Sequence, residues 1–176
     1  MSVFVLDTNI ISETAKEEPN PSVISWMKEN AGSLFLTSVT VEELRFGEYM
    51  LPEGKRRSAL KEWIDSLLFD YSESIFDFDA RAADACAKFH EQAIASGHTP
   101  TIEDLMIAGI AKMNNATVIT RNVRDFEYLD IPLINPFDSE GAGFIDPSFV
   151  VPPELDPGLD GELPSFDNCN EENPTG

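Results

Sequence analysis

The sequence predicts an α/β fold in three layers, with a small, mainly parallel sheet between two layers of helices. Short apolar segments of strand length alternate with longer segments in which apolar residues recur at helical spacing. The first short segment, residues 3–6, is apolar at every position, as expected of a strand that is covered on both faces. Strands that alternate with helices along a chain favour a parallel sheet.

The first strand ends at residues that can start a helix. Asp7, Thr8 and Asn9 follow it directly, and polar side chains of this kind cap helix N-termini. A short helix over 10–17 should follow. Two prolines then end that helix and introduce a second one over 22–30, whose apolar residues fall on one face.

The next segment predicts a strand and a pair of helices. Residues 34–37 are a second apolar strand segment. Thr40 and Glu43 have the spacing of a capping box, which predicts a helix from there to about residue 50. Residues 55–69 predict another helix with a basic group at its start, where positive charge opposes the helix dipole. The basic residues are Lys55, Arg56, Arg57 and Lys61.

The alternation continues with a brief strand and two more helices. The strand is expected at 74–78, and the long helix over 80–96 should be capped by Asp79. Thr101 and Asp104 again have capping-box spacing and open the next helix.

Two strands remain. Residues 116–120 are the clearest of the later strand segments, and a sharp turn leads from them into a short helix over 122–126. Residues 132–136 predict a last strand at an edge of the sheet, because prolines bracket it.

Charge and composition divide the chain into a domain and a tail. Residues 138–176 carry ten acids and no Lys or Arg, with six prolines and five glycines. Such a segment cannot bury enough apolar surface to offset its ordering entropy, so we expect most of it to be disordered. Residues 1–137, the predicted domain, hold 22 acids and 12 bases of a chain whose net charge is -20. This balance does not indicate nucleic-acid binding, but it permits a site that collects divalent cations.

Several classes of protein have no support in the sequence. No apolar run approaches the ~20 residues of a membrane helix, Met1 leads directly into the first strand without a signal peptide, and the two cysteines suggest no disulfide framework. We therefore expect a cytoplasmic protein. His90 and His98 have no third ligand at metal-site spacing, and the sequence has no P-loop, G-x-S-x-G or glycine-rich dinucleotide turn.

Four carboxylates occupy equivalent places in the predicted fold, just past a strand end or loop and near a helix start. They are Asp7, Glu43, Asp104 and Asp125. Any one of them alone is explained as a helix cap. However, the carboxyl ends of parallel strands meet at one edge of a sheet, so Asp7 and Asp125 should lie on the same edge. Carboxylates brought together repel one another unless a cation joins them, and oxygen ligands select Mg²⁺ or Mn²⁺ over zinc.

These residues and their surroundings resemble a PIN domain, and more narrowly the VapC-type ribonuclease toxins of bacterial type II toxin–antitoxin pairs. The segments that carry the resemblance are LDTNIISE at 6–13, ELRFG at 43–47, Asp104 followed by Ile107-Ala108, TRNVRDF at 120–126 and LINPF at 133–137. The resemblance covers residues 1–137 and implies the layered fold described above. It also implies that Asp7 and Asp104 are the principal Mg²⁺ ligands, with Glu43 and Asp125 completing the acidic pocket directly or through water.

The resemblance implies an endoribonuclease in which a metal-activated water attacks an RNA phosphodiester in line while the ion neutralises charge on the phosphoryl oxygens. Uncharged side chains would orient the carboxylates or the phosphate, although turn and cap chemistry explains them equally well. These side chains are Thr8, Asn9, Thr120 and Asn122. The candidate contacts to the RNA backbone are Arg45, Arg56, Arg57, Arg121 and Arg124.

The resemblance further implies a homodimer held by helix faces and a cognate antitoxin whose peptide blocks the pocket. The acidic tail departs from the family, whose members commonly end soon after the last strand. The tail is either dispensable or competes with RNA for the basic rim of the site. Two other functions stay open: an inactive PIN-like binding or regulatory module, and an Asp-based phosphohydrolase or receiver-like protein phosphorylated on Asp7.

Overall fold

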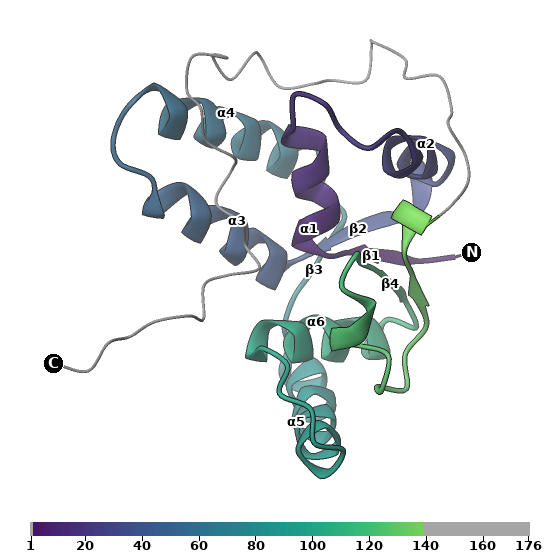
Figure 1. Ribbon diagram of the computed structural model, residues 1–176. Coiled ribbons are helices and arrows are strands. Elements are labelled where there is room, and N and C mark those ends of the chain that lie inside the picture. The colour runs from purple at the N-terminus through teal and green to yellow at the C-terminus, as the bar shows by residue number, and fades with distance from the viewer. Residues whose placement is uncertain (1, 139–176) are drawn as a thin grey trace, which may run out of the picture.

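The computed structural model describes residues 2–138, and its centre is a sheet of five parallel strands (Figure 1). The strands are β1 (Phe4–Leu6), β2 (Leu34–Thr37), β3 (Ile75–Phe76), β4 (Thr117–Ile119) and β5 (Leu133–Ile134). They are ordered β3-β2-β1-β4-β5, and every neighbouring pair is parallel. The predictions of a small parallel sheet and of a final edge strand are confirmed.

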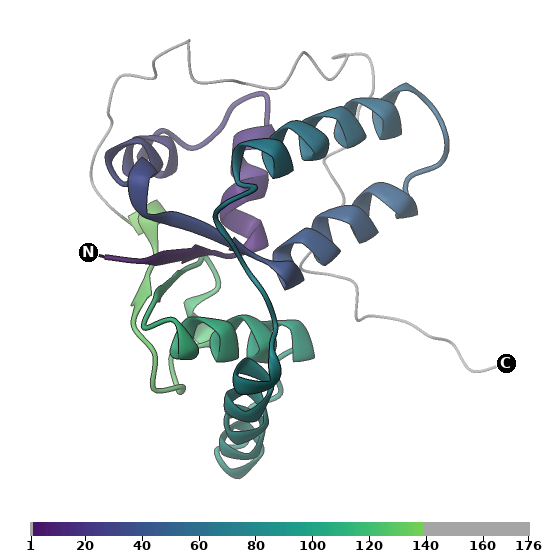
Figure 2. The same cartoon turned by 180° about the vertical axis from the view of Figure 1, so that it is seen from behind.

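Helices cover both faces of the sheet, as both views of the molecule show (Figure 1, Figure 2). One group comprises α1 (Thr8–Ile11), α2 (Pro21–Glu29), α3 (Ser38–Met50) and α4 (Lys55–Asp70), and the other comprises α5 (Ala80–Ala95) and α6 (Ile102–Met113). Short 3₁₀ turns lie at Ser12–Ala15, Ala31–Ser33, Val123–Asp125 (η3) and Pro136–Asp138 (η4). The expected three-layer fold is therefore confirmed.

Alternation along the central strand divides the core into two clusters. Val5 packs with α5 and α6, and the next residue, Leu6, packs with the helices on the other face. Helices α5 and α6 approach each other closely at Gly109, where a Cβ atom would lie 2.5 Å from the backbone oxygen of Ala82. The alternation of β1 thus directs successive side chains to opposite faces of the sheet. The strand ends at Leu6, directly before Asp7.

The capping box expected at Thr40 and Glu43 is wrong. Helix α3 begins earlier, at Ser38, and its cap is Thr37, whose Oγ1 accepts a 3.0 Å hydrogen bond from the backbone N–H of Thr40. Thr37 is the last residue of β2 and has extended backbone, so its hydroxyl can reach over the first turn of the helix. As a result Glu43 is not needed at the start of α3.

The other two predicted caps are confirmed. The side chain of Asp79 accepts hydrogen bonds from the backbone N–H groups of Arg81 and Ala82 at the start of α5. Thr101 and Asp104 form a complete capping box at the start of α6. Local spacing was sufficient to find both.

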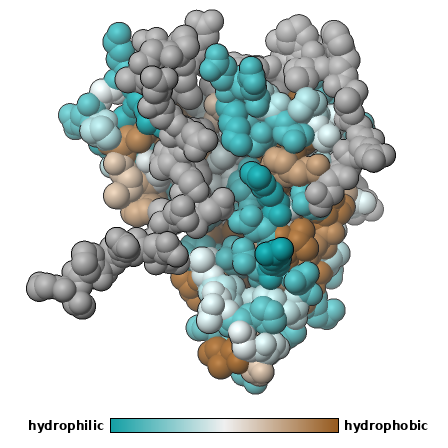
Figure 3. All heavy atoms as spheres, viewed as in Figure 1, coloured by the Kyte–Doolittle hydropathy of each residue, from teal (hydrophilic) through white to brown (hydrophobic). Residues whose placement is uncertain are grey.

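The tail expected to be disordered, residues 138–176, lies outside the described residues except for Asp138, so that expectation and the domain boundary remain predictions. Within residues 2–138, no helix is both long and apolar enough to span a membrane. The space-filling view shows hydrophobic residues at the left edge, over the outer part of α3, and near the lower tip formed by α5 (Figure 3).

Candidate active site

Asp7 lies at the carboxyl end of β1, in the position of the N-cap of α1, yet its side chain makes no capping hydrogen bond. The carboxylate is only 6% exposed. Its Oδ2 instead accepts hydrogen bonds from Thr120 Oγ1 at 2.6 Å and from Asn9 Nδ2 at 2.7 Å. Helix capping therefore does not explain this buried acid.

Glu43 projects from α3 toward the start of α1. Its Oε2 accepts a 2.5 Å hydrogen bond from Thr8 Oγ1. Burial raises the pKa of Glu43 to about 7; the bond from Thr8 opposes this, while the charges of Asp7 and Asp104 raise the pKa further. The carboxyl group is thus held in place by a neutral hydroxyl and surrounded by other acids.

Asp104 combines a structural and a site position. Its Oδ2 accepts a 2.7 Å hydrogen bond from Thr101 Oγ1 as part of the capping box of α6. Burial raises the pKa of Asp104 to about 7, the bonds from Thr101 oppose this, and the charges of Asp7 and Asp125 add to the rise. The side chain of Asp104 therefore both caps α6 and lies close to other acids.

The starts of α1, α3 and α6 lie at the same end of the sheet (Figure 1). The charges of Asp7 and Asp104 act on Glu43, and those of Asp7 and Asp125 act on Asp104. The structure therefore brings together the four acids that the sequence singled out.

Carboxylate and hydroxyl oxygens are the donors that Mg²⁺ prefers, and a buried acidic cluster of this kind fits a divalent cation chemically. Within residues 2–138, however, no three His, Cys, Asp or Glu side chains converge as a ready set of ligands. Like charges without a cation between them are expected to stand apart. The cluster has the charge and the donor chemistry for a metal, and its carboxylates would have to draw together around one.

The predicted orienting side chains form a hydrogen-bonded corner between β1 and β4. Asn9 Nδ2 contacts both Asp7 and Thr120, and its Oδ1 accepts a 3.2 Å bond from the backbone N–H of Arg121. Thr120 Oγ1, besides donating to Asp7, accepts a 2.9 Å bond from the backbone N–H of Asn122. Asn9 and Thr120 therefore fix the orientation of the Asp7 carboxylate.

The five candidate arginines do not share one environment. Arg45 pairs with buried Glu48 at 2.8 Å and also with Asp65, and Arg57 lies 3.9 Å from Glu48. These two arginines belong to an ion-pair network between α3 and α4. The others are Arg56, half-buried in the first turn of α4, and Arg121 and Arg124, exposed in the turn after β4. Only the last two flank the acidic corner directly in sequence.

Tyr128 is a residue that the sequence did not single out. Its hydroxyl is buried and has no hydrogen-bond partner among the described residues, and its ring stacks on His98 with centroids 3.9 Å apart. Burial raises the pKa of Tyr128 to about 12, and the charges of Asp104 and Asp125 add to the rise. An aromatic residue in a turn has no spacing that would have revealed this position beside the acids.

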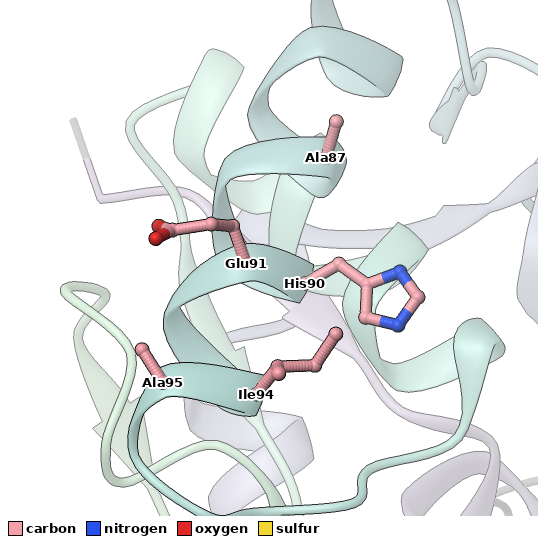
Figure 4. A pocket seen from close by; sticks show the side chains of 5 residues that line it. All are labelled: Ala87, His90, Glu91, Ile94 and Ala95. Carbon is pink, nitrogen blue, oxygen red and sulfur yellow. The ribbon is translucent and has the colours of Figure 1, made fainter.

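A shallow hollow on the outer face of α5 is separate from this site (Figure 4). Its lining residues are Ala87, His90, Glu91, Ile94 and Ala95. None of the four acids lines it, and His90 is exposed at the surface. The hollow therefore adds nothing to the acidic site.

Comparison with known proteins identifies the family. The model of the PIN domain matches residues 4–132. The chain belongs to the PIN-domain family. Relatives include VapC ribonuclease Y4jK of Sinorhizobium fredii, 35% identical over 77% of this chain and 99% of the relative, and toxin FitB of Neisseria gonorrhoeae, 33% identical over 77% and 99%.

The solved structures agree with this assignment. The FitAcB structure from Neisseria gonorrhoeae has a TM-score of 0.73 and 32% identity to this PIN domain, and the match covers 78% of this chain and 100% of that one. The resemblance to VapC-type proteins is therefore confirmed in both sequence and fold. In this chain the four acids lie beside α1 (Asp7), within α3 (Glu43), within α6 (Asp104) and within η3 (Asp125).

Proposed function

We propose that this PIN domain is a Mg²⁺-dependent endoribonuclease that acts as the toxin of a type II toxin–antitoxin pair. The observation that carries the proposal is the cluster of Asp7, Glu43, Asp104 and Asp125, in which burial and the neighbouring acids raise the pKa values of Glu43 and Asp104 to about 7. Buried acids kept at a cost in electrostatic energy are typical of functional sites. The names of the VapC ribonuclease and FitB toxin relatives support the nature of the activity.

In this proposal Asp7 and Asp104 hold Mg²⁺, or Mn²⁺ in its place, and Glu43 and Asp125 complete the acidic pocket. The bound ion would supply neutralisation of charge on the phosphodiester and a nucleophilic water at neutral pH. Asn9 and Thr120 keep the Asp7 carboxylate oriented through their hydrogen bonds.

The remaining roles belong to the edges of the site. Thr8 holds Glu43 through its 2.5 Å hydrogen bond. Exposed Arg121 and Arg124 would contact the RNA backbone, where positive charge positions a strand without reading its sequence. We further propose a cognate antitoxin as protein partner and a homodimer, both of which the resemblance to VapC-type toxins implies, and a cytoplasmic location.

The test is Mg²⁺-dependent cleavage of a mixed cellular RNA by the purified, antitoxin-free full chain. Asp7→Asn and Asp104→Asn should abolish cleavage, as should EDTA. Asp84→Asn is the matched control, since Asp84 is exposed on α5 and forms an ion pair with exposed Lys88 at 2.6 Å. Intact RNA with the wild type, or equal cleavage by the two site variants, would contradict the proposal.

The inactive binding module remains the second candidate, because residues 2–138 contain no converged set of metal ligands. Calorimetric titration with Mg²⁺ and Mn²⁺ separates the two. An active nuclease must bind a metal ion, and Asp7→Asn should weaken that binding. An inactive binding module has no need of a metal ion at Asp7. A phosphohydrolase would instead incorporate phosphate on Asp7, which mass spectrometry of the intact chain would detect.

A further inference from the structure

An aromatic stack joins the two segments that carry Asp104 and Asp125. The rings of His98 and Tyr128 lie nearly parallel, with centroids 3.9 Å apart and an interplanar angle of 11°. His98 lies in the loop between α5 and α6, shortly before Asp104 in the chain, and Tyr128 lies in the turn after β4, shortly after Asp125. Each partner of the stack therefore belongs to a segment that leads to an acid of the site.

The end of helix α5 fixes the backbone at His98. The helix ends in a Schellman motif, in which the backbone N–H of Gly97 donates to Ile94 O at 3.1 Å and that of His98 donates to Ala93 O at 2.9 Å. Gly97 has a φ of +75°, the left-handed conformation that this motif requires. With its ring also held against Tyr128, the imidazole is ordered in advance, which lowers the entropic cost of binding a ligand.

Tyr128 is anchored on its own side. Its backbone carbonyl accepts a 2.7 Å hydrogen bond from Gln92 Nε2 on α5, and nearby Phe126 is fully buried in the core. Burial, with a further contribution from the charges of Asp104 and Asp125, raises the pKa of Tyr128 to about 12. The hydroxyl end of the ring therefore lies near the acidic site, and the stack begins beside the acids.

Tyr128 covers one face of the His98 imidazole, yet His98 is an exposed residue. Its exposed surface therefore comes from the opposite face and the ring edges. We propose that this open face binds an unpaired RNA base by stacking, close to the phosphodiester that the acidic site cleaves. The ligand is single-stranded RNA, because a base within a duplex is stacked between its neighbours. The proposal rests on the ribonuclease function for its ligand, but it concerns binding and not the cleavage step.

The distribution of charge favours stacking on this side of the site. Residues 89–111, which include the loop, contain no Lys or Arg, and the chain has a net charge of -20. The exposed arginines near the acids, Arg121 and Arg124, lie in the turn after β4. Stacking on an aromatic ring requires no Lys or Arg, and histidine is among the residues on which unstacked RNA bases lie. The loop thus offers RNA an aromatic surface in place of basic side chains.

The first test is NMR spectroscopy of the full chain, whose two histidines make the imidazole signals easy to assign. Short oligoadenylate and oligouridylate are added in Ca²⁺, which takes oxygen ligands as Mg²⁺ does. A stacked base should shift the His98 ring protons upfield, because its ring current shields them. Exposed His90 on α5 is the internal control and should not shift. An oligonucleotide of abasic units keeps the phosphate charges and should leave His98 unshifted.

Cleavage kinetics give the second test. An RNA that the chain cuts is compared with RNAs that lack one base, at each position near the cut in turn. For the wild type, loss of the stacked base should raise KM by roughly 5-fold or more and leave kcat unchanged. His98→Ala should raise KM for intact RNA by a similar factor and make it insensitive to that base.

Matched variants separate stacking from a structural role of His98. His98→Phe keeps an aromatic ring and should retain the dependence of KM on the base. His98→Leu keeps an apolar contact with Tyr128 without an aromatic face, so it should behave like His98→Ala. His90→Ala replaces an exposed histidine outside the site and should behave like the wild type.

Several results would overturn the proposal. His98 signals that do not move, or that move equally with the abasic oligonucleotide, would show that the loop binds no base. If His98→Ala leaves KM unchanged, or raises it equally for intact RNA and for every RNA that lacks a base, His98 does not contact a base. A chain that cuts RNA without a base-dependent shift of His98 contradicts the stacking alone. A chain that shows the shift and cuts no RNA contradicts the ribonuclease function alone.

Discussion

Two glutamates on α3, Glu43 and Glu48, lie in contrasting surroundings. Glu48 is 3% exposed and has guanidinium partners, with Arg45 at 2.8 Å and Arg57 at 3.9 Å. Glu43 is partly buried and accepts a hydrogen bond from the hydroxyl of Thr8, and burial and neighbouring acids raise its pKa to about 7. One carboxylate is matched by cations, and the other is placed among like charges.

The difference separates a structural acid from a functional one. A buried ion pair has its charge compensated within the protein, and removing one partner leaves the other uncompensated. A buried acid beside other acids destabilises the fold unless something from outside, such as a cation, compensates it. Substitution should therefore affect stability at Glu48 and activity at Glu43.

The largest effect is expected for Glu43→Gln. The amide keeps the shape and can still accept the bond from Thr8, but it removes a negative charge from the pocket. We expect RNA cleavage to fall by about 100-fold or more, comparable to the loss of groups that support metal ligands. Stability should stay the same or increase, because a buried charge is removed. Single-turnover cleavage and thermal unfolding measure the two effects, and a stable, fully active variant would contradict the assignment.

Glu48→Gln should show the opposite pattern. Loss of the charge leaves Arg45 and Arg57 without their shared carboxylate, at a cost of about 2–3 kcal/mol in the free energy of unfolding. Cleavage per folded molecule should not change. Urea unfolding gives the cost, with exposed Glu42 on the same helix as control through Glu42→Gln. A Glu48→Gln variant as stable as this control would show that the ion-pair network contributes nothing.

Much of the fold follows from local signals in the sequence. Continuous apolar segments predicted the strands, and Asp79 and Thr101 predicted the starts of α5 and α6 because a cap depends on residues within one turn. The start of α3 could not be found in this way. Thr37 and Thr40 are both plausible caps, and the choice depends on where β2 ends in the sheet.

Site residues whose positions depend on the strand order could be predicted from the sequence, whereas those whose positions depend on packing between elements could not. Acids at the ends of parallel strands must meet at one edge, so Asp7 and Asp125 could be placed together from the sequence. Which arginines face solvent depends on partners across helices. The i,i+3 spacing allows Arg45 to pair with Glu48, but nothing in the sequence ties Arg45 to Asp65 on α4. The position of Tyr128 depends on the path of a turn, and no local pattern in the sequence reveals that path.

The pH dependence of stability gives a smaller test of the same contrast. In the folded, metal-free chain the pKa values of Glu43 and Asp104 are about 7, raised from the ordinary values of 4.5 and 3.8. Between these limits the folded state binds more protons than the unfolded state, so stability falls as pH rises from about 4 to about 7. These two groups should therefore make the chain less stable at pH 8 than at pH 5, by an amount on the order of a few kcal/mol.

Thermal unfolding in EDTA across this range would measure the loss. The double variant Glu43→Gln, Asp104→Asn should show a flatter profile than the wild type, and Glu48→Gln should keep the wild-type slope. Added Mg²⁺ should stabilise the wild type more at pH 8 than at pH 6, because the ion binds the deprotonated carboxylates. If the wild type and the double variant have the same dependence of stability on pH, the carboxyl groups of Glu43 and Asp104 are not raised in pKa by their surroundings.

The smallest effect is expected at Tyr128, whose buried hydroxyl has no partner within residues 2–138. Tyr128→Phe keeps the ring that stacks on His98 and removes a desolvated polar group, so stability should be unchanged or rise by up to about 1 kcal/mol. If the hydroxyl donates to the acids or to the substrate once these groups are drawn together, cleavage should fall by about 3–10-fold. Tyr71→Phe is the control, because burial raises the pKa of Tyr71 as well, and the charge that adds to the rise is that of Asp70 and not that of one of the four acids. Equal cleavage by both variants would show that Tyr128 only packs against its neighbours and that the carboxylates alone act in cleavage. A loss of cleavage in Tyr128→Phe but not in Tyr71→Phe would show that the neutral hydroxyl of Tyr128 acts together with the carboxylates.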